Sequence, residues 1–170
     1  MTDISLDDYK TLMFDCDGVV LNSNKIKTAA FYEVTKHYGH DVATAFVDYH
    51  VQNGGISRYE KFEYFISELL KKKLDQEELD SLLMSFAHVV KRELMTCKVA
   101  EGLKELREKT EHAKWLIVSG GDENELRDVF EKRDIAILFD GGIFGSPDNK
   151  ETILKREEER GNIVRKGLFL

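Results

Sequence analysis

Two carboxylates follow a short apolar run near the N-terminus. The run is Thr11-Leu-Met-Phe14, and Asp15-Cys-Asp17-Gly18 comes directly after it. A buried parallel strand here would present Asp15 and Asp17 at its carboxyl end, the edge where open α/β sheets bind ligands. One carboxylate could act as a nucleophile while the other supplies and removes protons. Gly18 would permit the tight turn between them. The alternative is a polar loop without catalytic function.

Two later positions carry groups suited to an anion. Ser119 ends a second apolar run, Trp115–Val118, and its hydroxyl could donate to a phosphate oxygen, although serines also serve turns and caps at such positions. Lys150 lies in the first turn of a predicted helix, with Ser146 expected as the N-cap and Pro147 as the first helical residue. A lysine there is unfavourable unless an anion lies nearby. Lys150 is therefore a phosphate-binding candidate, with simple solvent exposure as the alternative.

Arg58 is a third candidate for binding an anion. It follows Ser57, and a capping box formed by Ser57 and Glu60 explains that serine as the start of a helix. The guanidinium fork of Arg58 suits a phosphate or a carboxylate because it donates two parallel hydrogen bonds. The alternative is an arginine on the surface. A second capping box, Asp122 with Glu125, predicts another helix start.

A parallel sheet would bring these residues together, and the chain has the pattern of one. Apolar runs alternate with helical patterns, which favours an α/β fold with a Rossmann-like parallel sheet covered by helices. The predicted strands are 11–15, 115–118, a weaker run at 135–144 that is interrupted at 140–142, and a fourth that begins at 167. Helices are predicted at 122–133 and 148–160.

Nearly a hundred residues separate the first two strands, far more than a crossover connection needs. Helical patterns fill this segment, at about 24–38, 43–51, 57–73, 76–95 and 100–110. We therefore predict a helical domain, 22–97, inserted into an α/β domain made of 1–21 and 98–170. An apolar stripe on the third helix predicts its buried face, consisting of Tyr59, Phe62, Phe65, Ile66 and Leu69.

The composition disfavours several classes of function. The 170 residues include 32 acidic and 25 basic side chains, for a formal net charge of −7, which argues against a nucleic acid partner. The sequence contains neither an apolar stretch of about 18 residues nor a basic leader, so we expect no membrane insertion and no export. Cys16 and Cys97 lie far apart without zinc-ligand spacing, which favours a reducing, cytoplasmic location.

The segment 14–23 is similar to the first motif of the haloacid dehalogenase-like (HAD) superfamily, Asp-x-Asp-Gly-Val-x-x-(Asp/Asn)-Ser. With the later motifs, the resemblance covers essentially the whole chain. It implies that Asp15 is a nucleophile that attacks phosphorus, and that Asp17 protonates the leaving oxygen and then deprotonates water. Dehalogenases of the superfamily lack the second aspartate, so Asp17 favours phosphoryl transfer over carbon–halogen cleavage.

The strand end at Ser119 resembles the second motif, and 146–150 resembles the third. The resemblance therefore implies that Ser119, Gly120 and Lys150 bind the phosphate. It also implies a Mg²⁺ cofactor, held by the Asp15 carboxylate and the backbone carbonyl of Asp17. Magnesium often takes only one or two protein carboxylates together with water and phosphate.

The segment 54–58 resembles the substrate-specificity loop in the helical caps of the β-phosphoglucomutase and phosphoglycolate phosphatase-like branch. The resemblance implies that Arg58 contacts the substrate and that residues 22–97 form the cap. The family's fourth motif places one or two further metal-binding acids after the fourth strand, whereas this sequence stops at Leu170 within that strand. We therefore expect a chain that is truncated before this motif, with a weakened metal site.

These features together predict an enzyme, a magnesium-dependent phosphatase. Its substrate would be a small phosphorylated metabolite, and the reaction would pass through an aspartyl-phosphate. A phosphomutase of the β-phosphoglucomutase type is the first alternative, because the same groups can move phosphate within a sugar. A non-catalytic domain that keeps the fold but lacks a competent metal site is the second. The sequence indicates neither the substrate nor the oligomeric state, because fold does not determine function.

Overall fold

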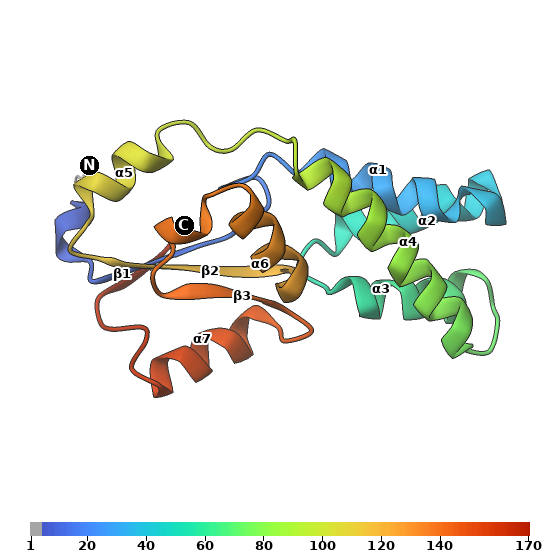
Figure 1. The fold of residues 1–170 in the computed structure, drawn as a ribbon. Coiled ribbons are helices and arrows are strands. Elements are labelled where there is room, and N and C mark those ends of the chain that lie inside the picture. The colour runs from blue at the N-terminus through green and yellow to red at the C-terminus, as the bar shows by residue number, and fades with distance from the viewer. Residues whose placement is uncertain (1–4) are drawn as a thin grey trace. The chain divides into compact units, whose positions relative to one another are not determined.

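The computed structural model describes residues 5–170, which fall into two compact units. An α/β unit consists of residues 5–22 and 98–170, and a helical unit consists of residues 23–97 (Figure 1). The chain thus leaves the α/β unit after its first strand and returns to it for the others. The α/β unit holds all but one of the predicted site residues, the exception being Arg58.

The α/β unit is built on four parallel strands, as predicted. Each inner strand pairs in parallel with its neighbours, and Phe14 lies opposite Ile117 in the register. The order across the sheet is β3-β2-β1-β4. The strands are β1 (Thr11–Phe14), β2 (Lys114–Asp122), β3 (Gly142–Ser146) and β4 (Gly167–Phe169).

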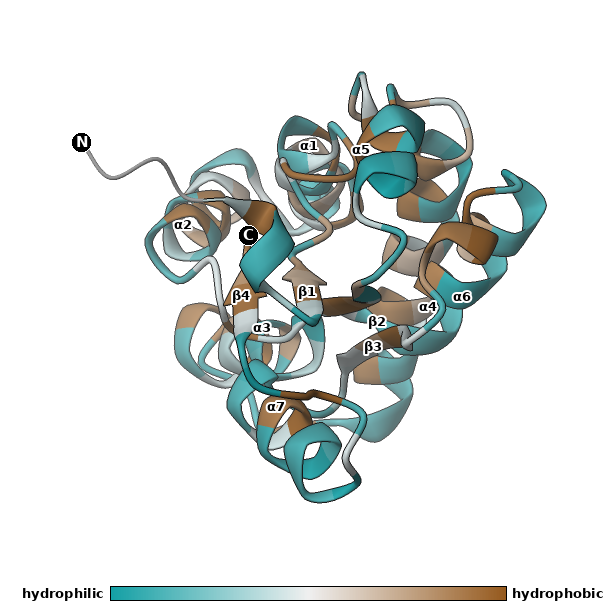
Figure 2. Cartoon of the chain, turned by 90° about the vertical axis from the view of Figure 1, so that its left-hand side faces the viewer, coloured by the Kyte–Doolittle hydropathy of each residue, from teal (hydrophilic) through white to brown (hydrophobic). Residues whose placement is uncertain are grey.

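Helices cover both faces of the sheet. Helices α5 (Leu103–Lys109) and α6 (Glu123–Lys132) lie on one side, and α7 (Lys150–Glu159) lies on the other (Figures 1 and 2). The strands are largely hydrophobic (Figure 2), and their side chains alternate between the faces as strand geometry requires. A cluster on the α7 face contains Met13, Leu116, Val118, Ile153 and Ile163.

The opposite face carries aromatic side chains. The ring of Phe14 lies 4.5 Å from that of Trp115 and 5.8 Å from that of Phe139, and Phe130 of α6 packs on Phe139 at 5.5 Å. Trp115 is fully buried. Burying one large apolar side chain contributes about 2–3 kcal/mol. These contacts support the strand that ends at Asp15.

The third strand begins later than predicted. The run from Ile135 does not continue as a strand, because Ala136–Leu138 forms a 3₁₀ turn and β3 starts only at Gly142. Gly141 donates its backbone N–H to the carbonyl of Trp115 at 2.8 Å, and a Cβ at Gly141 would lie 2.5 Å from the side chain of Leu116. Gly141 and Gly142 therefore let the chain approach β2 closely and start the strand there.

The start of α7 also differs from the prediction. Ser146 is the last residue of β3 rather than an N-cap, and the peptide bond between Ser146 and Pro147 is cis. Asn149 caps the helix, because its side-chain oxygen accepts a hydrogen bond from the N–H of Thr152 at 2.8 Å. Lys150 is consequently the first residue of α7. The Asx cap prevails because Ser146 is committed to the sheet, where it pairs with β2.

The predicted capping box at Asp122 is confirmed, since the Asp122 carboxylate accepts the N–H of Glu125 at 2.9 Å. The predicted cap at Ser57 is confirmed as well, with a 3.3 Å hydrogen bond from the N–H of Glu60 to the Ser57 hydroxyl. Both helices start where a side-chain oxygen satisfies an otherwise unpaired backbone donor.

The helical unit has a core of phenylalanine side chains from four segments. Phe62, Phe65 and Ile66, from the predicted stripe, are fully buried, and Phe31 contacts Phe62 and Phe86 with ring centres 5.5 and 4.2 Å apart. The segments are α1 (Asn24–Thr35), α2 (His40–Gln52), α3 (Arg58–Tyr64), which continues as a π-helical turn at Phe65–Leu69, and α4 (Gln76–Leu94). Two 3₁₀ turns complete the elements, at Leu6–Asp8 and Lys36–Tyr38.

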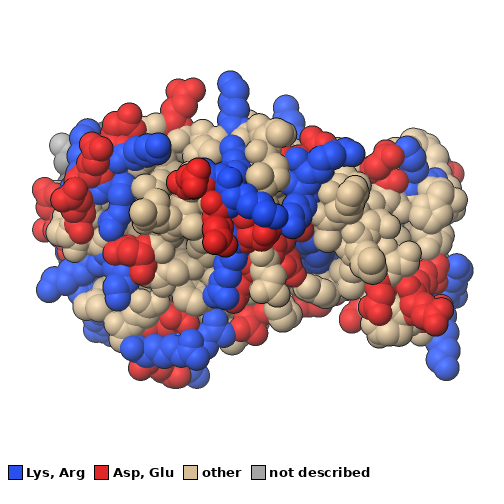
Figure 3. All heavy atoms as spheres, viewed as in Figure 1, with Lys and Arg blue, Asp and Glu red and all other residues tan. Residues whose placement is uncertain are grey.

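Charges of both signs are interspersed over the face shown in Figure 3. None of the helices within residues 5–170 is both long enough and apolar enough to cross a membrane.

Candidate active site

The site is built around Asp15, which comes directly after β1. Lys150, the first residue of α7, donates from Nζ to Oδ2 of Asp15 at 2.6 Å, although 135 residues separate them in sequence. The backbone N–H of Cys16 donates to Oδ1 of the same carboxylate at 2.7 Å. Both carboxylate oxygens are therefore held, and the side chain of Asp15 keeps 28% of its surface exposed. Such a group can react with a solute while its orientation is fixed.

A tight turn follows Asp15 and carries Asp17. The carbonyl of Cys16 accepts the N–H groups of Val20 and Leu21, both at 3.0 Å, and Gly18 donates its N–H to the carbonyl of Leu21 at 2.8 Å. Gly18 has a φ of 76°, which agrees with the expected need for glycine in this turn. Asp17 is half-buried, and only Cys16 separates it from Asp15 in the chain.

Ser119 and Gly120 lie on β2, next to β1. The register pairs Phe14 with Ile117, so Ser119 lies beside the turn that follows Asp15. The strand does not end at Ser119 as predicted, because β2 continues to Asp122. Ser119 is buried, and its hydroxyl oxygen accepts the N–H of Gly121 at 3.0 Å. Ser119 therefore stabilises the backbone locally, as a turn serine does, which is the alternative function that the sequence suggested for it. It uses a lone pair of the oxygen and leaves the hydroxyl proton available as a donor.

Arg58 lies in the helical unit and is buried, with 7% of its surface exposed, rather than being a surface arginine. The centre of its guanidinium is 4.7 Å from the ring of Phe86. Sequence reasoning overlooked Lys61, one turn further along the same helix, which is 2% exposed and whose Nζ lies 2.9 Å from Nδ1 of His50. Residues three apart lie on the same face of a helix, so the spacing of Arg58 and Lys61 could have indicated that the two basic side chains share one face.

The Asp15 carboxylate and the backbone carbonyl of Asp17 are oxygen donors of the kind that Mg²⁺ prefers. Within residues 5–170, no group of three or more His, Cys, Asp or Glu side chains could hold a metal ion. The donors present thus fit a magnesium ion that keeps water and substrate oxygens in its shell, and not a site made by protein side chains alone.

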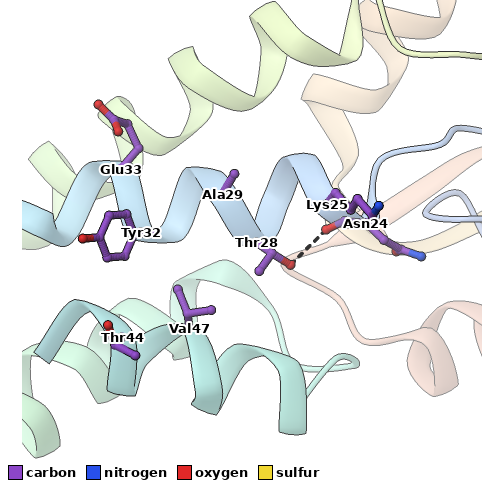
Figure 4. A pocket seen from close by; sticks show the side chains of 8 residues that line it. All are labelled: Asn24, Lys25, Thr28, Ala29, Tyr32, Glu33, Thr44 and Val47. Carbon is purple, nitrogen blue, oxygen red and sulfur yellow. Dashed lines mark hydrogen bonds between the residues drawn. The ribbon is translucent and has the colours of Figure 1, made fainter. Parts of the chain in front are cut away.

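A surface cavity of about 620 Å³ lies in the helical unit, between α1 and α2 (Figure 4). Its walls include Thr28 and Ala29 of α1 and Thr44 and Val47 of α2. None of the predicted site residues lines it.

Comparison with known proteins supports the fold and identifies the family. A family model of haloacid dehalogenase-like hydrolases matches residues 9–164. No curated protein matches the chain by sequence. Among solved structures, a predicted phosphoglycolate phosphatase from Haemophilus somnus is similar, with 16% identity, a TM-score of 0.69 and coverage of 97% of this chain and 77% of that one.

Two further structures show the same fold. A β-phosphoglucomutase from Clostridium difficile has 21% identity and a TM-score of 0.67, and the match covers 88% of this chain and 70% of that one. A HAD-hydrolase from Bacillus subtilis, bound to magnesium, has 17% identity and a TM-score of 0.61, with 95% and 78% of the two chains covered. The expected α/β fold with an inserted helical segment is confirmed.

Proposed function

Because this chain belongs to the haloacid dehalogenase-like hydrolase family, we propose that it is a phosphatase acting on a small phosphorylated metabolite. The observation that carries the proposal is the 2.6 Å contact between Lys150 and Asp15 at the carboxyl end of β1. A carboxylate beside a fixed cation is suited to attack a phosphate, because the cation offsets the charge of both partners.

In the first step, a carboxylate oxygen of Asp15 attacks phosphorus, and the bond to the ester oxygen breaks. Asp17 donates its proton to that leaving oxygen. The product alcohol leaves, and the phosphoryl group remains on Asp15 as an aspartyl-phosphate. In the second step, Asp17 takes a proton from water, the resulting hydroxide attacks phosphorus, and inorganic phosphate and free Asp15 are formed.

Three groups would bind the phosphoryl oxygens during both steps. Lys150 supplies a positive charge. The hydroxyl of Ser119 and the backbone N–H of Gly120 each supply a hydrogen-bond donor. The N–H of Cys16 keeps the Asp15 carboxylate in a single orientation, as its 2.7 Å hydrogen bond to Oδ1 suggests. An oriented nucleophile lowers the entropic cost of the reaction.

Magnesium is the proposed cofactor, held by the Asp15 carboxylate and the backbone carbonyl of Asp17. When bound, it would supply positive charge to the phosphoryl oxygens. A magnesium-bound structure of a protein with the same fold is consistent with this choice.

We assign residues 22–97 as the cap, with Arg58 binding the part of the substrate that leaves. Its burial beside Phe86 supports this role, because a guanidinium held on an aromatic ring stays ordered for a bidentate contact. Residues 1–21 and 98–170 form the catalytic core. Cys16 and Cys97 both carry thiols, which is consistent with the reducing environment of the cytoplasm.

Release of inorganic phosphate from a panel of small phosphate monoesters, with and without Mg²⁺, tests the proposal. Asp15→Asn should abolish turnover while the circular dichroism spectrum stays unchanged, because the amide is a poor nucleophile. Isomerised sugar phosphate from a hexose 1-phosphate would instead identify a mutase. Absence of turnover with every ester and with Mg²⁺ present would identify a non-catalytic domain, and phosphate release by Asp15→Asn would refute the assigned nucleophile.

A further inference from the structure

A second cluster of charged side chains surrounds a cavity in the α/β unit, at the edge of the sheet formed by β3. The cavity has a volume of about 300 Å³. Arg127 of α6 and Arg156 and Arg160 of α7 line it, together with the carboxylates of Glu123 and Asp148. Neither Asp15 nor Lys150 lines this cavity. Three guanidinium groups and two carboxylates line its wall, and a third carboxylate, that of the buried Glu157, lies behind Arg156 and Arg160.

The protein holds each guanidinium through only some of its N–H groups, although Arg156 pairs with two carboxylates, Asp148 and Glu157. Arg127 donates from Nε to the carbonyl of Ile143 at 2.9 Å, and its Nη2 lies 2.7 Å from Glu123. Arg156 and Arg160 contact one carboxylate oxygen of the buried Glu157, from Nε at 3.1 Å and from Nη1 at 3.3 Å. Within the described residues, Nη1 of Arg127 and Nη2 of Arg156 and of Arg160 make no hydrogen bond. Each side chain therefore keeps donors available to a ligand.

The positions of two of these groups are also fixed by an aromatic ring. The guanidinium carbons of Arg127 and Arg156 lie 5.9 and 5.8 Å from the centre of the Phe144 ring. Cation–π contacts of this kind restrict a guanidinium to one region. The two arginines come from different helices, so they reach the cavity wall from separate directions.

Ser146, which also lines the cavity, provides an independent observation. Its hydroxyl is the one buried side-chain polar atom within residues 5–170 that has no hydrogen-bond partner, and the residue is 2% exposed. An unsatisfied buried polar group costs about 1–3 kcal/mol. Such groups in native proteins call for an explanation, and a bound ligand or ion is one that also accounts for the arginines.

We propose that this cavity binds a phosphate group, either as inorganic phosphate or as the phosphate of a metabolite, at a site separate from Asp15. A carboxylate is planar and offers only two oxygens, whereas a tetrahedral phosphate offers several acceptors in different directions. The latter geometry matches N–H donors from three guanidinium groups carried by two helices. The proposal extends beyond the phosphatase reaction and does not depend on it.

The cavity adjoins the segment that leads to Lys150. Arg156 forms an ion pair with Asp148, two residues before the lysine that contacts Asp15. A phosphate that competes with Asp148 for Arg156 would therefore act next to the catalytic lysine. Binding at this cavity must be distinguished from binding at Asp15. The experiment therefore needs a method that reports on individual residues.

Inorganic phosphate titrated into the ¹⁵N-labelled full chain tests the site by nuclear magnetic resonance. Concentrations up to about 10 mM would largely fill a site with a millimolar Kd. We expect shifts of the backbone amides of Asn124, Gly145 and Ser146 and of the Nε–H signals of the arginines. These shifts should persist in Lys150→Gln, which alters the catalytic site only. Methylphosphonate serves as a second probe, because its binding would show that the phosphate end of a metabolite is accepted.

Arg160→Gln should weaken phosphate binding at the cavity by about tenfold or more, since a charge-assisted hydrogen bond is lost. The double variant Arg127→Gln/Arg160→Gln should weaken it further. Lys132→Gln, which removes a positive charge from α6 outside the cavity, is the matched control and should bind normally. Absence of shifts at Gly145 and Ser146 in the wild-type protein would overturn the proposal, as would equal weakening by Lys132→Gln.

Discussion

At the scale of single residues, the Asp15 carboxylate accepts a hydrogen bond at each of its two oxygens. One of its oxygens contacts the ammonium of Lys150 at 2.6 Å, and the other accepts a backbone N–H at 2.7 Å. The side chains of Lys150 and Asp15 are 33% and 28% exposed, and partly exposed ion pairs of this kind contribute little to stability. The value of the contact therefore lies in orientation and charge, which matter for reaction with a phosphate.

Lys150→Gln should lower kcat for a chromogenic aryl phosphate by about 100-fold or more, because the charge facing the phosphoryl oxygens is lost. The urea denaturation midpoint should change little. Lys155→Gln removes an exposed lysine from the same helix and should leave kcat unchanged. Equal activity of Lys150→Gln and wild type would contradict the role assigned to this lysine.

At the scale of elements, the start of α7 determines where Lys150 lies. The side chain of Asn149 accepts the N–H of Thr152 at 2.8 Å and caps the helix. Ser146, the residue that the sequence suggested as cap, has a buried hydroxyl with no hydrogen-bond partner within residues 5–170. The two side chains are therefore expected to differ in what their removal costs.

Asn149→Ala should lower the free energy of unfolding by about 1 kcal/mol, the usual cost of losing an N-cap. Ser146→Ala should leave stability unchanged or slightly raised, because it removes an unsatisfied polar atom. Urea denaturation of both variants, in a buffer without phosphate, measures the difference. A larger loss for Ser146→Ala than for Asn149→Ala would show that the cap lies at Ser146 after all.

The C-terminal half of α7 contains the buried carboxylate of Glu157. Burial raises its pKa, but hydrogen bonds from Asn162 and Arg156 and the charge of Arg160 outweigh burial, so the pKa lies below its ordinary value of 4.5. The ionised form is thus favoured in the folded state. Its contribution to stability is complete above the unfolded-state pKa and is lost as pH falls below about 4.5 through the folded-state pKa.

Glu157→Gln should therefore reduce the acid-dependent loss of stability between roughly pH 5 and pH 3. At pH 7 it should lower the free energy of unfolding by about 1–2 kcal/mol, because the hydrogen bonds to the buried carboxylate lose their charge. The measurement is urea denaturation as a function of pH. Glu158→Gln, which changes an exposed neighbour, is the control. If Glu157→Gln loses as much stability at low pH as the wild type does, Glu157 is not the group responsible for that loss.

At the scale of the whole molecule, the helical unit is an insertion whose two ends meet in the α/β unit. Asn22 donates its backbone N–H to the carbonyl of Lys98 at 3.0 Å, and Leu21 pairs with Val99 in a β-bridge. The helical unit has its own buried phenylalanine core, including Phe46 and Phe62 at 0% exposure. Each unit thus has the features of an independently folding body.

Replacement of residues 23–97 by a short Gly-Ser linker should leave the α/β unit folded, because the linker need only join two adjacent backbone positions. In a nuclear magnetic resonance spectrum, the backbone amide signals of the β1 and β2 residues should remain close to those of the intact chain. If the helical unit is the cap, the shortened chain should also lose selectivity among phosphate esters. A collapsed, poorly dispersed spectrum would show that the two units do not fold independently.

Several features follow from local sequence alone. The apolar run before Asp15, the caps at Ser57 and Asp122, and the stripe that includes Phe62 all depend on neighbouring residues or on helical and strand periods. Hydrogen bonds and burial patterns over a few residues determine them. Local patterns therefore predicted the parallel α/β fold, the helical insertion and the strand end that carries the two aspartates.

Other features were decided only by the tertiary structure. The order β3-β2-β1-β4 and the packing of α7 bring Lys150 to Asp15 across 135 residues, and no local pattern encodes such a distance. The late start of β3 depends on how closely Gly141 approaches β2, and the shift of the α7 cap depends on the pairing of Ser146 in the sheet. The cavity with Arg127 and Arg156 arises because two helices on opposite faces meet at one sheet edge. These features depend on packing between distant segments, whose energies a one-dimensional pattern does not contain.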